Sequence, residues 1–197
     1  MSNLVVMFPG LGYTNDKPLL YYGKKLANAA GYDDCHPIKF GVVNKTGLQG
    51  NPEKMMEVYK RLYKTAVKSL AEIEWTKYDK ILFISKSIGT VVAASYENEL
   101  TESWKNDPTK KEILPPIKQI LFTPLEQTFI FHPSNAIGFI GTNDPWCNPR
   151  EVVNLANKQY IPINVYEKAN HSLETGDVIT DIENLKNVMD ICKKFLL

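Results

Sequence analysis

Ser87 lies in a pattern that can activate a hydroxyl group. It is the central residue of a Ser-x-Ser-x-Gly sequence at 85–89, which directly follows a continuous apolar run at 81–84. A helix-compatible segment of small and branched residues comes next, at 91–94. A strand, a sharp turn and a helix form the context in which a Gly-x-Ser-x-Gly sequence presents a serine as a nucleophile. The pattern therefore predicts attack by the Ser87 hydroxyl, with the free N–H groups of the helix start pointing toward the same place.

Two further residues can supply what such a serine needs. A hydroxyl is a poor nucleophile at neutral pH, so it requires an imidazole to take its proton and a carboxylate to hold that imidazole in the right tautomer. Asp144 follows the apolar run 136–140, and His171 follows the run 161–167. Ser87, Asp144 and His171 thus each come just after a predicted strand, at the same edge of a sheet. We predict that they form a catalytic triad.

Other residues of the same types offer alternatives. Ser85 is the rival nucleophile, but we expect it on the strand rather than at the apex of the turn. Glu126, just after the predicted strand 117–123, is the rival acid. His36 lies at the start of a predicted strand and His132 in a short connection, and we expect both to be structural or solvent-facing.

A tetrahedral intermediate also needs N–H donors aimed at its negative oxygen. Losing one such donor typically costs about 3–4 kcal/mol of transition-state stabilisation. The backbone N–H of Ile88, the residue after the nucleophile, is one expected donor. The loop at 9–12, Pro-Gly-Leu-Gly, can supply the other, because its glycines let the backbone approach a substrate closely. We assign this second donor to Leu11.

The elements that must position these residues alternate along the chain. Short apolar runs read as strands, and capped amphipathic segments between them read as helices. Such an alternation implies crossover connections and a mainly parallel sheet covered by helices on both faces. The periodicity places Tyr22 and Ile182 on the inward faces of the first and last helices. The expected strands are 4–8, 37–43, 80–85, 117–123, 136–140 and 161–167, and the expected helices are about 16–31, 51–75, 88–99, a segment starting at 148, and 178–195.

These motifs together resemble the α/β-hydrolase superfamily, in its small esterase and dienelactone-hydrolase-like branch. The resemblance covers residues 4 to about 196 and rests on the sequences at 9–12, 85–89, 141–144 and 170–171. It implies an α/β three-layer sandwich with about six strands, a carboxyl-ester or related acyl hydrolase activity, an acyl-serine intermediate and no cofactor. Two positions depart from the family pattern: Ser85 stands where glycine is usual, and Pro9 stands where histidine is frequent.

The chain looks trimmed relative to that family. We expect the family's leading antiparallel strands to be absent, and only residues 124–135 are available where a cap usually follows the fourth strand. We therefore expect a minimal fold without a cap and an open site. Its acyl pocket should be made by loop residues, namely Tyr13, Leu125 and Trp146.

Composition sets the broader limits. A chain of 197 residues suits one domain, residues 1–197, and a formal net charge of +1 argues against a nucleic-acid partner. The longest apolar runs fall far short of the 18 residues of a membrane span, and no basic segment precedes residues 4–8, so we expect a soluble, cytoplasmic protein. Three cysteines at no metal-like spacing argue against a metal site. The expected partner is a small-molecule acyl substrate, and the oligomeric state stays open.

The leading hypothesis is a serine hydrolase of small carboxylic esters or thioesters. One alternative is a binding protein on a hydrolase scaffold whose triad is unused. Another keeps the fold but performs lyase or acyltransferase chemistry.

Overall fold

Six parallel strands form one sheet in the order β2-β1-β3-β4-β5-β6. The computed structural model describes residues 2–109 and 113–197; Met1 and residues 110–112 of the expected domain lie outside the described part. The strands are β1 (Ser2–Phe8), β2 (Asp34–Pro37), β3 (Tyr78–Lys86), β4 (Ile117–Phe122), β5 (Ala136–Gly141) and β6 (Ile163–Tyr166). The helices are α1 (Pro18–Ala29), α2 (Pro52–Leu70), α3 (Ile88–Asn106), α4 (Pro149–Lys158) and α5 (Val178–Leu196), with short 3₁₀ helices η1 (Trp75–Lys77) and η2 (Glu126–Phe131).

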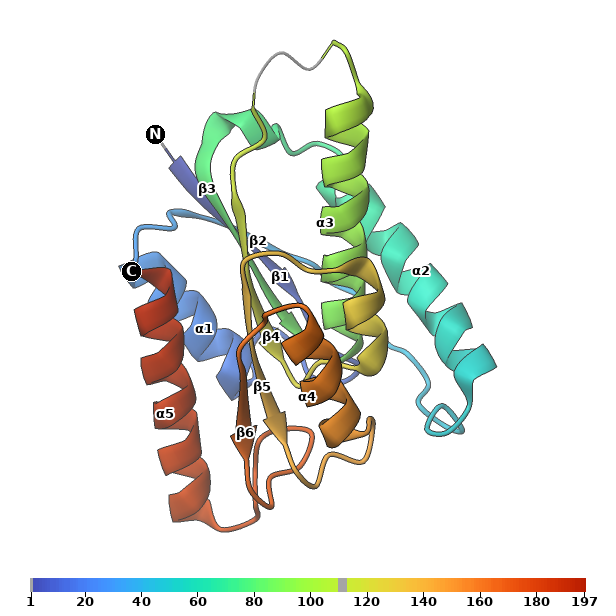
Figure 1. The fold of residues 1–197 in the computed structure, drawn as a ribbon, viewed down its shortest axis with the longest axis vertical. Coiled ribbons are helices and arrows are strands. Elements are labelled where there is room, and N and C mark those ends of the chain that lie inside the picture. The colour runs from blue at the N-terminus through green and yellow to red at the C-terminus, as the bar shows by residue number, and fades with distance from the viewer. Residues whose placement is uncertain (1, 110–112) are drawn as a thin grey trace.

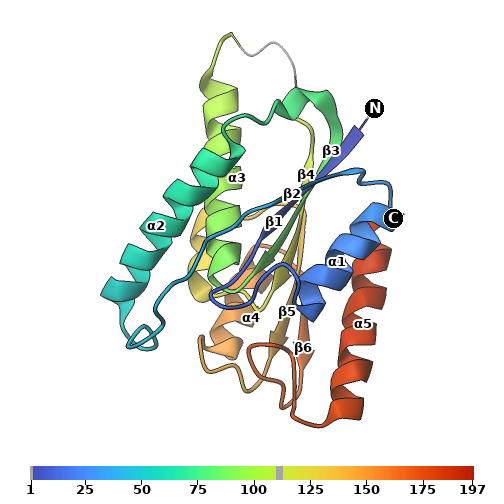
Figure 2. The same cartoon turned by 180° about the vertical axis from the view of Figure 1, so that it is seen from behind.

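The helices cover both faces of the sheet, which makes three layers. Helices α1 and α5 lie on one face, and α2, α3 and α4 lie on the other (Figures 1 and 2). The central strand β3 is therefore apolar on both faces: Leu82 and Ile84 pack under α1 and α5, while Ile81 and Phe83 pack under α2 and α3. The expected α/β three-layer sandwich with a parallel sheet is confirmed.

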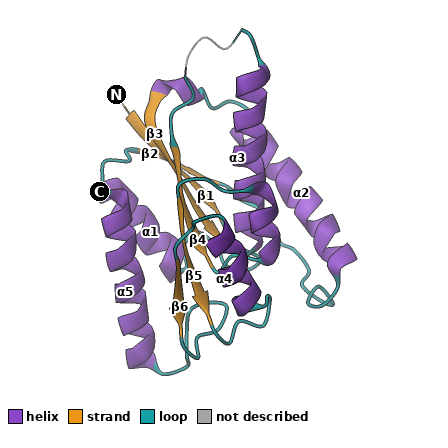
Figure 3. Ribbon diagram, in the orientation of Figure 1, coloured by secondary structure: helices purple, strands orange, loops and turns teal. Residues whose placement is uncertain are grey.

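All six strands run in the same direction, so their carboxyl ends share one edge of the sheet. In Figure 3 the arrowheads of β5 and β6 point toward the lower edge, where the loops after these strands gather. In open parallel sheets, ligands bind beyond the carboxyl ends of the strands. The frame thus brings the loops after β1, β3, β5 and β6 to one place.

The expected strand at 37–43 is wrong. β2 ends at Pro37, and its pairing with β1 extends only to a hydrogen bond from the Ile38 N–H to the Met7 carbonyl, 2.9 Å. Ile38 and Phe40 are buried by packing against the core under α2, and Gly41 has φ +71°, which breaks the extended run. The apolar pattern here signals burial of a loop rather than strand pairing.

Two helices also differ from expectation at their ends and faces. α2 ends at Leu70, five residues before the expected end, whereas α3 continues to Asn106. Tyr22 is 46% exposed, because the buried face of α1 runs through Leu19, Leu20, Gly23 and Ala27. Ile182 is 58% exposed, since the first turns of α5 present their apolar side chains to solvent.

Candidate active site

Ser87, His171 and Asp144 form one hydrogen-bonded chain at the carboxyl edge of the sheet. The distance from His171 Nε2 to Ser87 Oγ is 2.7 Å, and from His171 Nδ1 to Asp144 Oδ2 it is 2.6 Å. Ser87 follows β3, Asp144 follows β5 and His171 follows β6. Segments that are up to 84 residues apart in the sequence thus meet within hydrogen-bond distance. The structure brings together all three residues that the sequence analysis selected.

The backbone at Ser87 is strained in the way that a sharp turn requires. Its φ is +57° and its ψ is −130°, a region that costs a non-glycine residue on the order of 1–3 kcal/mol. The Ser87 N–H is held by the Phe122 carbonyl at 2.9 Å. A Cβ on Gly89 would overlap the carbonyl oxygens of Phe8 and Pro9, so only glycine lets the start of α3 pack against the end of β1. These contacts place the Ser87 hydroxyl at the apex of the turn.

Asp144 and His171 sit on loops that are tied to each other. The Asn143 N–H donates to the Ala169 carbonyl at 3.0 Å, which joins the loop after β5 to the loop after β6. Asp144 is 5% exposed, and its Oδ1 accepts a hydrogen bond from the Trp146 N–H at 2.9 Å. Oδ1 is therefore engaged by the backbone, while Oδ2 remains directed at His171.

The electrostatic surroundings favour a neutral imidazole at His171. Burial lowers the pKa of His171, and the nearby ammonium of Lys86 lowers it further, while the contact with Asp144 opposes both effects. A neutral imidazole that donates from Nδ1 to Asp144 has a free lone pair at Nε2. That nitrogen faces the Ser87 hydroxyl and can accept its proton.

The alternative residues have other partners. The Ser85 hydroxyl is buried and donates to the Ile120 carbonyl at 3.2 Å, within the sheet. Glu126 Oε1 accepts from the Asn148 N–H at 2.6 Å, just before α4. His36 Nε2 lies 2.8 Å from Ser69 Oγ, and His132 ends η2 in a left-handed conformation. These contacts stabilise the fold, and none of these residues joins the hydrogen-bonded chain of Ser87.

The two residues expected to supply oxyanion donors lie beside Ser87. Leu11 and Ile88 line a cavity of about 190 Å³ together with Ser87 and His171. Ile88 is the first residue of α3, so its N–H has no acceptor within the helix. The Leu11 loop is closed by a hydrogen bond from the Gly10 N–H to the Tyr13 carbonyl, 3.1 Å. Donation by these two amides to a bound oxygen stays a prediction.

The three residues expected to contact substrate separate into two hollows. Tyr13 and Trp146 line the 190 Å³ cavity at Ser87. Leu125 instead lines a neighbouring apolar groove of about 330 Å³, which shares Ile88, Met55 and Trp146 with the cavity. We refer to these two hollows as the serine cavity and the apolar groove. They meet at these shared residues, of which Ile88 directly follows the nucleophile.

Sequence reasoning missed the wall of the apolar groove. Residues 48–52 and the first turns of α2 form one side, and η2 forms the other. Met55 and Tyr59 lie on the predicted helix 51–75, but a helical period shows only that a face is covered and not what covers it. No local signal in the sequence brings this helix to the elbow.

Lys86, the residue before the nucleophile, was also missed. It is 1% exposed, its Nζ donates to Thr123 Oγ1 at 2.5 Å, and it lies 4.9 Å from the centre of the Tyr13 ring. Burial lowers the pKa of Lys86 to about 7, although Asp144 opposes that shift. A cation is thus held behind the triad at the point where the elbow, β4 and the Leu11 loop meet.

Lys86 leads to a prediction about pH. Below pH 7 Lys86 is mainly charged, and its charge helps to keep His171 neutral. Lys86→Met removes that repulsion, so the pKa of His171 rises and a higher pH is needed to free the base. We expect the acid limb of kcat/KM for ester hydrolysis to move to higher pH. Lys64→Met, at an exposed position of α2, is the matched control. An unmoved acid limb in Lys86→Met would show that the Lys86 charge does not act on His171.

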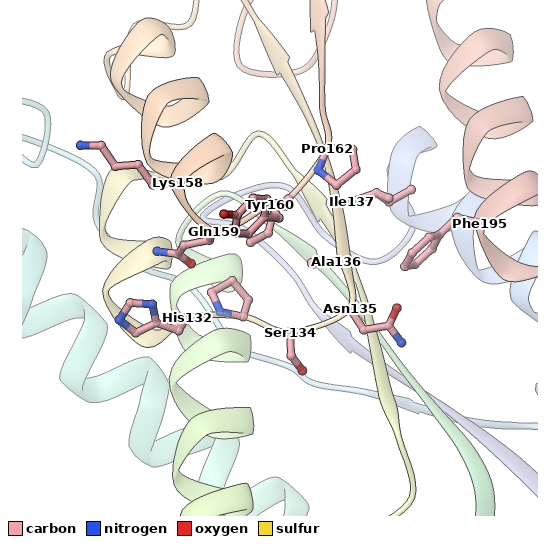
Figure 4. Close-up of a pocket in the computed structure, with 12 residues that line it drawn as sticks. His132, Ser134, Asn135, Ala136, Ile137, Lys158, Gln159, Tyr160, Pro162 and Phe195 are labelled. Carbon is pink, nitrogen blue, oxygen red and sulfur yellow. The ribbon is translucent and has the colours of Figure 1, made fainter.

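A third hollow lies at the opposite edge of the sheet. It has a volume of about 730 Å³ and is lined by residues before β5 and β6 and at the end of α5, including His132, Tyr160 and Phe195 (Figure 4). Its size exceeds that of the serine cavity, but the triad is at the other end of the strands. Volume alone therefore does not mark the site, whereas the hydrogen-bonded chain of Ser87 does.

Within 2–109 and 113–197, no group of three or more His, Cys, Asp or Glu side chains is arranged to hold a metal ion. In the same part of the chain, no helix has the length and apolar character needed to cross a membrane.

No protein-family model and no curated protein matches this chain. Solved structures do match. An alpha-beta serine hydrolase homologue from Coxiella burnetii is 15% identical with a TM-score of 0.60, covering 100% of this chain and 85% of that one. An esterase from Pyrococcus furiosus is 15% identical with a TM-score of 0.62, covering 100% and 84%. A serine hydrolase without a lid from Xanthomonas campestris is 11% identical with a TM-score of 0.58, covering 98% and 80%.

At these identities the likeness concerns the fold. The matches extend over nearly the whole chain, and the connection after β4 holds only the short helix η2 where a cap would be inserted. The chain therefore has the α/β-hydrolase fold, in its lidless form.

Proposed function

We propose that this protein is a serine hydrolase that cleaves small carboxylic esters or thioesters through an acyl-serine intermediate. The observation that carries the proposal is the hydrogen-bonded chain from Ser87 Oγ through His171 to Asp144 at the carboxyl edge of the sheet. The fold shared with serine hydrolases and an esterase supports it. These two hydrogen bonds support a catalytic triad, because a triad is recognised by the contacts and roles of its residues rather than by their positions in the sequence.

The proposed reaction has two halves. Ser87 Oγ attacks the carbonyl carbon while its proton passes to His171 Nε2, and Asp144 stabilises the imidazolium that forms. The negative oxygen lies against the N–H groups of Leu11 and Ile88. His171 then gives the proton to the leaving oxygen or sulfur. A water molecule, activated by the same nitrogen, releases the acid and restores Ser87.

The two hollows fit the two sides of an ester. The leaving group must lie near His171, which protonates it, and His171 lines the serine cavity. The acyl chain can then enter the apolar groove, whose walls include Val91, Leu125 and Phe131. A volume of about 330 Å³ equals roughly eleven water molecules at about 30 Å³ each. The groove can therefore take a short or medium acyl chain.

A panel of 4-nitrophenyl esters tests this assignment. Each buried methylene contributes about 0.8 kcal/mol, or roughly fourfold. We expect kcat/KM to rise from acetate to acyl chains of about six to eight carbons and then to flatten, as the groove fills. Because no lid has to open, the rate should show no jump above the solubility limit of the substrate. The acid released is measured to establish that the product is that of hydrolysis.

Variants at the groove make the test specific. Ile130 lines the groove and is 67% exposed, so Ile130→Asp should fold while lowering the ratio of hexanoate to acetate hydrolysis. Ile113→Asp, at a 91% exposed position outside the groove, is the matched control and should keep that ratio. A ratio unchanged in Ile130→Asp would place the acyl chain elsewhere. Hydrolysis of no ester, without labelling of Ser87 by a fluorophosphonate, would favour the silent binding protein, and products other than acid and alcohol would favour a lyase or transferase.

A further inference from the structure

Two lysine side chains line the serine cavity. Lys45, from the loop before α2, and Lys86, from the end of β3, both line it. Both ammonium groups act on His171, since each lowers its pKa. Among the described residues that line this cavity, none is an aspartate or glutamate. An anion that entered the cavity would therefore meet the Lys45 ammonium, together with that of Lys86 below about pH 7, and no carboxylate on its walls.

The Lys45 ammonium lies close to the Leu11 loop, where Gly12 has no side chain. Gly12 has φ +69°, and a Cβ at that position would overlap Lys45 Nζ. The glycine thus leaves room for an ammonium against the backbone of the loop that borders Ser87. Lys45 is itself exposed, so its charge stands at the mouth of the cavity, where a substrate can contact it.

Lys86, when protonated, adds positive charge beneath the floor of the serine cavity. Its hydrogen-bond partner is the Thr123 hydroxyl, and within residues 2–109 and 113–197 it forms no ion pair. The carboxylates that act on it are Asp144, which is already bound to His171, and then Glu174. A buried cation without an ion-pair partner is costly, and a nearby anion reduces that cost. Lys86 is too buried to touch a ligand and acts through its charge.

We propose that the serine cavity selects esters whose alcohol portion carries a carboxylate, and that Lys45 contacts this carboxylate. The inference rests on the proposed function, because the leaving side of the ester is the side that His171 must reach. It adds a charge requirement that ester hydrolysis by itself does not need. The substrate class is then an ester with an acyl chain in the apolar groove and an anionic leaving group in the serine cavity.

A matched pair of substrates tests the charge requirement. 3-Acetoxybenzoate and methyl 3-acetoxybenzoate have the same acyl group and ring and differ in the charge of the leaving group. Each kcat/KM is divided by the rate of hydrolysis of the same ester by neutral imidazole, an uncharged nucleophile, which corrects for intrinsic reactivity without a charge bias. We expect the normalised ratio of anion to neutral ester to be about five. It should fall when the salt concentration is raised to about 1 M, where the screening length is about 3 Å.

Three variants distinguish a direct contact between Lys45 and the carboxylate from the general electrostatic field of the protein. Lys45→Gln should bring the normalised ratio to within about twofold of one, whereas Lys45→Arg should retain most of it. Lys54→Gln removes an equal charge from the exposed surface of α2, outside the cavity, and should leave the ratio unchanged. Equal losses in Lys45→Gln and Lys54→Gln, or a loss in Lys45→Arg as large as in Lys45→Gln, would overturn the contact.

The failures of the two proposals are distinguishable. If both benzoates are hydrolysed with a normalised ratio near one, the charge requirement is wrong and the serine hydrolase stands. If neither is hydrolysed and Ser87 is not labelled by a fluorophosphonate, the proposed function itself fails.

Discussion

Ser87→Ala is expected to abolish ester hydrolysis, with kcat lowered by a factor on the order of 10⁵–10⁶. The Ser87 hydroxyl is the group that faces His171 Nε2, so its removal leaves the imidazole without a nucleophile to activate. The turn itself depends on the Ser87 N–H bond to Phe122 and on Gly89, which the substitution leaves intact. We therefore expect the free energy of unfolding to change by no more than about 1 kcal/mol. Steady-state kinetics, fluorophosphonate labelling and denaturant unfolding measure the three quantities.

Ser85→Ala is the matched control for this variant. It removes the same hydroxyl two residues earlier, where the group donates to the Ile120 carbonyl inside the sheet. Its expected effect is a loss of about 1 kcal/mol of stability with activity retained. Residual activity above a few per cent in Ser87→Ala, together with an inactive Ser85→Ala, would move the nucleophile to Ser85.

The sequence predicted the triad contacts because its signals are local. Each of the three residues directly follows an apolar run, and parallel strands bring their carboxyl ends to one edge. Any parallel arrangement places Ser87, Asp144 and His171 at the same edge. Their hydrogen bonds also require the strand order, in which β5 and β6 are neighbours and only β4 separates β3 from β5. The distances of 2.6 and 2.7 Å agree with the contacts that the triad prediction requires.

The sequence could not predict features that arise from packing between distant segments. The apolar groove needs α2 and η2 to approach each other across more than 50 residues of chain, and no pattern within either segment encodes that approach. Lys86 is a second case. Lysine side chains almost always lie at the protein surface. Lys86 is instead buried at the end of β3, next to the Tyr13 ring and Thr123. The wrong strand at 37–43 has the same origin, because burial of Ile38 and Phe40 does not require pairing.

Asp144→Asn is expected to lower kcat by about 10⁴ with little change in KM. Asp144 Oδ2 accepts from His171 Nδ1, which leaves Nε2 free to take the Ser87 proton. An asparagine can present its NH₂ group there, and the imidazole then carries its proton on Nε2, where it can no longer act as the base. The amide oxygen can still accept the Trp146 N–H, so the loop should keep its conformation. The loss of the carboxylate also lowers the pKa of His171 further, because Asp144 is the group that raises it.

Glu126→Gln is the control for this variant. The Glu126 carboxylate accepts from the Asn148 N–H, and kcat of the variant should stay within a few-fold of the wild-type value. A full loss in Glu126→Gln with an active Asp144→Asn would assign the acid to the segment after β4 and would refute the catalytic role of the Asp144–His171 contact.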